Sequence, residues 1–135
     1  MRYPGSLSMC AIGTFVTDCT PYSHYANLSP VAEAALKAQL QCARGAVARE
    51  GFEIRLQATD SYNFSAYRTE AFRRTVDVLM VSVGVEGDTA EVHVAPGSGN
   101  LMAEERGYVA APTSASAKEA AHRVEAECPP QPAHE

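Results

Sequence analysis

The pattern of apolar and polar residues first predicts a helix over residues 29–50. Ser29 followed by Pro30 is typical of a helix start, with the serine as N-cap and the proline in the first turn. Gly51 follows the segment, and glycine favours the left-handed conformation that ends many helices. Apolar residues recur at helical spacing and predict the face that packs on a core: Leu36, Leu40, Ala43 and Val47.

From Phe52 onward apolar residues alternate with polar ones, which is the pattern of a half-buried β-strand. The alternation predicts four strands, over residues 52–58, 64–68, 75–85 and 90–94. The third segment is apolar on both faces, so we expect it to be a central strand. Glu86-Gly87-Asp88 predicts a tight turn after it.

Residues 96–112 contain several glycines and acidic residues, and we expect them to form a long loop. Loops longer than about 12–15 residues are uncommon and are often functional. A closing helix is predicted over residues 113–128, because Ala117, Ala121, Val124 and Cys128 share one helical face. Pro129-Pro130 ends this helix, and residues 129–135 are expected to be a disordered tail.

The order of one helix, four strands and one helix predicts an α+β fold. Sequential strands joined by short turns favour a four-stranded antiparallel meander. Both helices are expected on one face, because a bare sheet would leave its apolar side in water. The sequence therefore predicts a two-layer sandwich over residues 29–128.

Composition and charge exclude several classes of protein. A chain of 135 residues has room for one ordinary domain, and 46% hydrophobic with 20% charged residues is typical of globular proteins. The net charge of −5 argues against a nucleic-acid partner or a polybasic membrane surface. No apolar run approaches the roughly 20 residues that a membrane-spanning helix needs.

The first residues resemble a secretory signal, because Arg2 precedes an apolar run over residues 7–16. Cys19 follows as the lipid-attachment cysteine of a bacterial lipobox does, although Asp18 stands where that motif has a small residue. We expect a signal segment over residues 1–18, a tether over 19–28, and a periplasmic or membrane-anchored protein. The alternative is a cytoplasmic domain whose N-terminus is a buried strand or helix.

Two cysteines remain in the predicted domain, Cys42 in the first helix and Cys128 at the end of the last. An even pair in an exported domain predicts a disulfide, and two helices on one sheet face can bring the two residues within bonding range. The alternative is a pair of separate buried thiols in a reducing cytoplasm. The spacing of cysteines and histidines matches no metal motif, and we expect no cofactor.

The polar residues that could carry chemistry are spread over different strands. His93 is expected at a solvated strand position, and Asp77 in a surface ion pair, next to Arg73 and Arg74. Neither comes with the nucleophile and orienting group that catalysis needs. The alternative is a small ligand-binding or enzymatic domain with a pocket between sheet and helices, lined by Tyr62, Tyr67, Asp77 or His93.

Several blocks resemble a type of small uncharacterised bacterial envelope lipoprotein. The matching positions are Cys42, Gly51-Phe52, Asp77-Val78-Leu79, Val81-Ser82-Val83 and Cys128, and the resemblance covers residues 36–128. It implies an architecture and no catalytic residue. We therefore expect a non-enzymatic envelope module that binds a protein or wall component. Its interaction surface is expected in the long loop, at Glu104, Glu105, Arg106 and Tyr108. A cytoplasmic adaptor is a further alternative.

Overall fold

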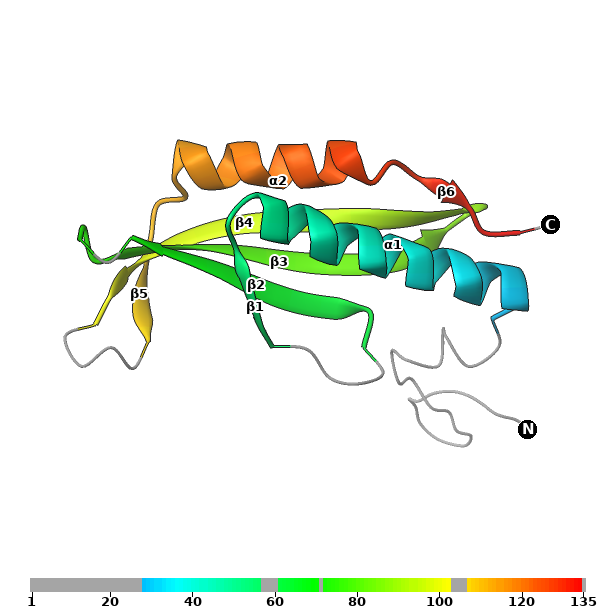
Figure 1. Ribbon diagram of the computed structural model, residues 1–135, viewed down its shortest axis with the longest axis horizontal. Coiled ribbons are helices and arrows are strands. Elements are labelled where there is room, and N and C mark those ends of the chain that lie inside the picture. Colours follow the sequence, from blue (N-terminus) through cyan, green and yellow to red (C-terminus); the bar gives the residue numbers. More distant parts are fainter. Residues whose placement is uncertain (1–27, 57–60, 71, 103–106, 135) are drawn as a thin grey trace, which may run out of the picture. The chain divides into compact units, whose positions relative to one another are not determined.

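A computed structural model describes residues 28–56, 61–70, 72–102 and 107–134 of the chain. Residues Val31–Glu135 belong to one compact unit. The predicted signal segment, Cys19 and the tether up to residue 27 lie outside the described residues. The elements follow in the order α1 (Pro30–Arg49), β1 (Glu53–Leu56), β2 (Asn63–Glu70), β3 (Thr75–Glu86), β4 (Thr89–Leu101), β5 (Tyr108–Ala111), α2 (Ala115–Glu127) and β6 (Gln131–Pro132) (Figure 1).

The strands form one antiparallel sheet in the order β1-β2-β3-β4-β5, and the two-residue β6 pairs with β4. This confirms the α+β class and the antiparallel sheet. The predicted count of four strands is wrong, because β5 and β6 add to it. The predicted loop over 96–112 is also wrong in its first and last parts: β4 continues to Leu101, and β5 pairs back onto it.

Pro96 and Gly99 suggested a loop, but each has a place in the strand. Val94 directs its backbone N–H away from β3 to Oε2 of Glu125, at 2.7 Å. Pro96 has the same orientation two residues later. Among the described residues no strand pairs with β4 on that side at this point, so the missing N–H of Pro96 costs no sheet hydrogen bond. A Cβ at Gly99 would lie only 2.2 Å from Cδ2 of Tyr108, so glycine is what allows β5 to pack this closely.

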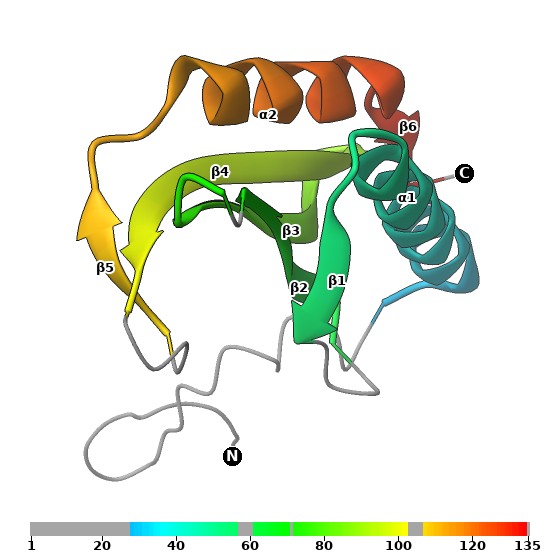
Figure 2. The ribbon, with the colours of Figure 1, turned by 60° about the vertical axis from the view of Figure 1, so that its left-hand side comes forward.

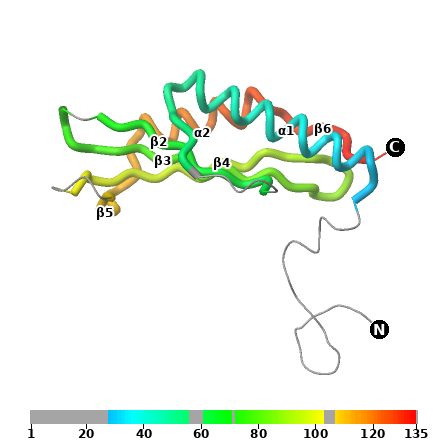
Figure 3. The backbone as a smooth tube through the Cα atoms, turned by 60° about the horizontal axis from the view of Figure 1, so that its bottom comes forward, coloured from blue at the N-terminus to red at the C-terminus, as the bar shows by residue number. Residues whose placement is uncertain are grey.

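Both helices lie on the same side of the sheet (Figure 3), which gives the expected two layers. The core between them is made of small and medium apolar side chains, among them Leu36, Ala43, Val47, Phe64, Leu79, Val81, Val83, Val92 and Val124. The opposite face of the sheet is called the open face below. Figure 2 shows that the sheet bends so that β1 and β5 flank its open face.

The buried face of α1 includes Leu36, Ala43 and Val47 as predicted, and it adds Ala32, Gln39 and Ala46. Leu40 is half-buried, and Gln39 is buried instead, at 2% exposure. The Gln39 amide donates to the backbone oxygens of Ala90 and Pro129, at 3.0 and 2.8 Å. A buried polar side chain is stable when it is hydrogen-bonded, and this one links α1 to β4 and to the segment after α2.

Cys42 and Cys128 form a disulfide, with their Cα atoms 6.0 Å apart, which confirms the predicted pairing. The bond ties α1 to the end of α2. The chain after α2 was expected to be disordered, yet β6 pairs with β4, and Ala133 is buried with its N–H donating to the Asp88 oxygen.

Within the described part of the chain, neither helix has the length and hydropathy needed to cross a bilayer.

Candidate functional site

Two connections that are far apart in the sequence lie at the same end of the sheet. The first is the turn between β2 and β3, and the second is the hairpin between β4 and β5. The strand register brings them together, because Thr75 lies opposite both Glu70 and Asn100, and Asn100 lies opposite Val109. Residues 70, 72–75, 100–102 and 107–109 therefore occupy the same end of the sheet.

This end carries a group of exposed apolar side chains, called the apolar tip below: Phe72, Met102, Tyr108 and Val109. Their exposed fractions are 96%, 44%, 39% and 60%. Among the described residues only one other large hydrophobic side chain is exposed, Met80 at 58%. Single exposed apolar residues are ordinary, whereas a contiguous exposed apolar patch is a candidate interaction site. The four side chains share one end of the sheet but not one face, because Tyr108 and Val109 are adjacent in β5 and point to opposite faces.

The backbone holds the turn at the tip in a defined shape. Arg74 has a φ of 56°, in the left-handed region that a non-glycine residue adopts at some cost. Its backbone oxygen accepts the N–H of Leu101 at 2.8 Å, and its guanidinium donates to the Met102 oxygen at 2.7 Å. These two hydrogen bonds join the β2–β3 turn, which carries Phe72, to the end of β4.

Tyr108 is the one predicted interaction residue within the described part of the chain. Glu104, Glu105 and Arg106 lie outside the described residues. Tyr108 begins β5, and its ring packs against Gly99 and meets the edge of Tyr67 at 6.3 Å between centroids. It thus combines a packing contact with an exposed surface.

Asp77 lies on the helix-covered face, in a polar network that anchors the start of α2. Its Oδ1 accepts the hydroxyls of Ser98 and Ser114 at 2.8 and 2.9 Å, and its Oδ2 accepts Arg68 at 3.2 Å. Ser114 is the N-cap of α2. The ion-pair partner is Arg68, not the neighbouring Arg73 or Arg74 that the sequence suggested, and the pair is partly buried. The network joins the start of α2 to β2, β3 and β4.

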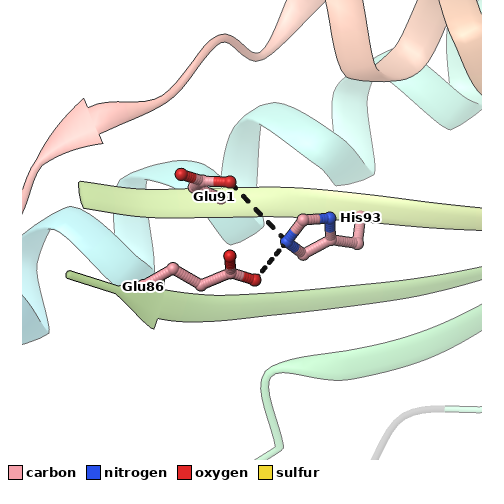
Figure 4. Close-up of side chains that lie close together, drawn as sticks. All are labelled: Glu86, Glu91 and His93. Carbon is pink, nitrogen blue, oxygen red and sulfur yellow. Dashed lines mark hydrogen bonds and ion pairs between the residues drawn. The ribbon is translucent and has the colours of Figure 1, made fainter.

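His93 lies on the open face at the other end of β3 and β4 (Figure 4). Its Nε2 is 2.6 Å from Glu86 Oε2 and 3.7 Å from Glu91 Oε1. The register places His93 opposite Ser82, five residues from Asp77 along β3, and strand residues separated by an odd number point to opposite faces. Asp77 and His93 therefore do not share a site.

A shallow groove of about 1080 Å³ crosses the middle of the sheet. The side chains that line it on the open face are Asn63, Ser65, Met80, Ser82, His93 and Ala95. Of the four pocket residues that the sequence suggested, only His93 is among the lining residues; Tyr67 lies farther along β2, and Tyr62 precedes that strand.

The sequence did not single out Phe72 and Met102, which the structure leaves exposed at the apolar tip. The sequence did hold a signal for Phe72, because it is a lone aromatic residue in the charged turn between two strands, where no core can cover it. Met102 gave no such signal, since its exposure depends on the β4–β5 pairing.

No protein family, curated protein or solved structure matches this chain in comparisons with known proteins.

Proposed function

We propose that this chain is a non-enzymatic binding module of the bacterial cell envelope that captures a protein partner through its apolar tip. The observation that carries the proposal is the concentration of exposed apolar side chains at one end of the sheet, with Phe72 at 96% exposure. Leaving a phenylalanine in water forgoes about 1.5–3 kcal/mol relative to burying it. A partner that covers the tip would recover this free energy.

The residue types at the tip favour a protein partner over a wall polysaccharide. Phe, Tyr, Met and Arg are enriched in protein interfaces, and in the β2–β3 turn Phe72 is followed by the exposed Arg73 and Arg74. A hydrophobic centre with a polar rim is the usual anatomy of such an interface. Polysaccharide recognition would instead need several hydrogen-bonding side chains around a ring platform.

The disulfide favours an exported location, because such bonds persist in oxidising compartments and are rare in the cytosol. The signal-like residues 1–18 are consistent with export. Cys19 would then be the site of a lipid that anchors the protein to the membrane. The non-enzymatic character rests on the separation of the candidate acid–base residues, since Asp77 is engaged in anchoring α2 and His93 faces the other side of the sheet.

Site-specific photocrosslinking in the native envelope tests the proposal. A photoreactive phenylalanine analogue is placed at position 72 and, in a second protein, at position 109, both on the tip. The matched control places it at Lys118, an exposed position on α2. We expect one and the same protein adduct from positions 72 and 109 and none from position 118. Phe72→Asp should then abolish the adduct formed from position 109.

Two results would overturn the proposal. One is the absence of a protein adduct from both tip positions. The other is the same set of adducts from Lys118 as from the tip, which would indicate nonspecific contact. Because Phe72 is almost fully exposed, Phe72→Asp is expected to leave the folded domain intact, and circular dichroism of the purified variant checks this.

A further inference from the structure

Glu86, Glu91 and His93 form a mixed group of donors at the turn between β3 and β4, at the opposite end of the sheet from the apolar tip. One atom from each side chain, an imidazole nitrogen or a carboxylate oxygen, lies within 4.8 Å of the other two. We propose that these three side chains bind a divalent transition-metal ion of the zinc type. This inference does not depend on the proposed function.

The register of the hairpin brings the three donors to one face. Glu91 lies opposite Gly84 and His93 opposite Ser82 on β3, so both side chains point to the open face. Glu86 is two residues beyond Gly84 on the same face. Because Gly84 has no side chain, nothing from β3 stands between Glu86 and the imidazole, and Figure 4 shows the three side chains converging.

The spacing of the donors fits a tetrahedral ion. Bonds of about 2.0–2.2 Å to nitrogen and oxygen place two donors roughly 3.3–3.6 Å apart. His93 Nε2 is 2.6 Å from Glu86 Oε2 and 3.7 Å from Glu91 Oε1, which lie on either side of that value. All three are long side chains, and Glu86 and His93 are more than half exposed, so small rotations reach the metal-bound separation.

The donor types point to a transition metal rather than to calcium or magnesium. An imidazole beside two carboxylates suits zinc and its neighbours, whereas calcium and magnesium prefer oxygen donors alone. Thr89 Oγ1 donates to Glu91 Oε2 at 2.8 Å, which orients this carboxylate as second-layer partners do in metal sites. Three protein donors leave the fourth position of a tetrahedral ion open, either to water or to a ligand bound in the groove that His93 also lines.

Titration of the metal-free full-length protein with zinc chloride, followed by calorimetry, tests the site. We expect a component of one zinc per chain, weakened at least about tenfold by His93→Gln and by Glu86→Gln. The matched controls are Asp88→Asn and His134→Gln, which alter a second histidine–carboxylate pair beside the same turn, 3.2 Å apart. Among the described residues, this pair does not belong to a group of three possible metal ligands. Both controls should bind zinc as the unchanged protein does. Zinc held by other residues would appear as a component that none of the variants changes.

Long-range ¹H–¹⁵N spectra of the imidazole rings give an independent readout. Zinc is expected to shift Nε2 of His93 and to leave the ring of His122, on the surface of α2, unchanged. The proposal is overturned if His93→Gln and Glu86→Gln bind zinc as tightly as the unchanged protein. It is equally overturned if the control variants lose as much affinity, or if the His93 ring does not respond. Unchanged circular dichroism of the variants excludes unfolding as the cause of a loss.

Discussion

Removing the Cys42–Cys128 disulfide is a perturbation whose size follows from the position of the bond in the chain. The two cysteines are 86 residues apart, so the bond closes most of the described domain into one loop. In the chain-entropy treatment, a cross-link over a loop of this length stabilises the folded state by about 4–5 kcal/mol, because it restricts the unfolded chain. Small domains have about 5–15 kcal/mol in total, so the loss would be a large fraction of it.

The double variant Cys42→Ala/Cys128→Ala is the cleanest form of the experiment, because it leaves no unpaired thiol at either position. Other links remain, such as the 2.9 Å ion pair between Arg123 of α2 and Glu50, the residue that follows α1, so we expect a folded but weakened domain. Urea unfolding of the unchanged protein and of the variant, each with and without reductant, measures the loss. Reductant should lower the midpoint of the unchanged protein and leave that of the variant in place. A difference below about 1 kcal/mol would refute the reasoning from loop length.

Three further predictions concern packing, the α2 anchor and pH. Gly99→Ala should destabilise the domain by about 1–3 kcal/mol in urea unfolding, because the new Cβ would collide with the ring of Tyr108. The control Gly97→Ala, whose Cβ would have no atom within 4 Å, should change stability by less than about 0.5 kcal/mol. Asp77→Ala removes the acceptor of three hydrogen bonds and should cost about 2–4 kcal/mol by the same measurement; a near-neutral result would contradict the anchoring role. The hydrogen bond from Arg123 lowers the pKa of Glu50 below its ordinary value. The Glu50 carboxylate therefore contributes stability that is fully present above the pKa it has in the unfolded chain and is lost as the pH falls through its pKa in the folded protein. Glu50→Gln should therefore flatten the acidic limb of stability against pH, and an unchanged limb would argue against it.

Local chemistry made the helices and the central strand predictable. Pro30 and Gly51 mark the limits of α1, and Gly51 has the expected positive φ of 88°. The β-branched run of 75–85 became β3. The end of β4 was misassigned because proline and glycine signal a loop when each residue is considered alone. Whether Pro96 interrupts a strand depends on which neighbours pair beside it, and that information lies in the tertiary structure.

The buried position of Gln39 shows the same limit within a helix. An apolar pattern assigns the core face to Leu40, since leucine is the more hydrophobic residue. In the structure Gln39 is buried instead, and its amide donates to the backbone oxygens of Ala90 and Pro129. For the candidate site, the sequence located the region of Tyr108 but not the adjoining Phe72, because only strand pairing brings the two connections together.

The interactions that hold the domain together are concentrated on one face of the sheet. The disulfide, the Gln39 bonds and the network around Asp77 all join helices to each other or to the covered face. The apolar tip and the Glu86–His93 pair lie instead at the two ends of β3 and β4, on side chains that are mostly exposed. Because surface substitutions away from core contacts usually change stability by less than about 0.5 kcal/mol, both surfaces can be altered without unfolding the domain. This separation is what allows the crosslinking and zinc experiments to report on binding alone, since a loss of signal at Phe72 or His93 need not reflect a loss of fold.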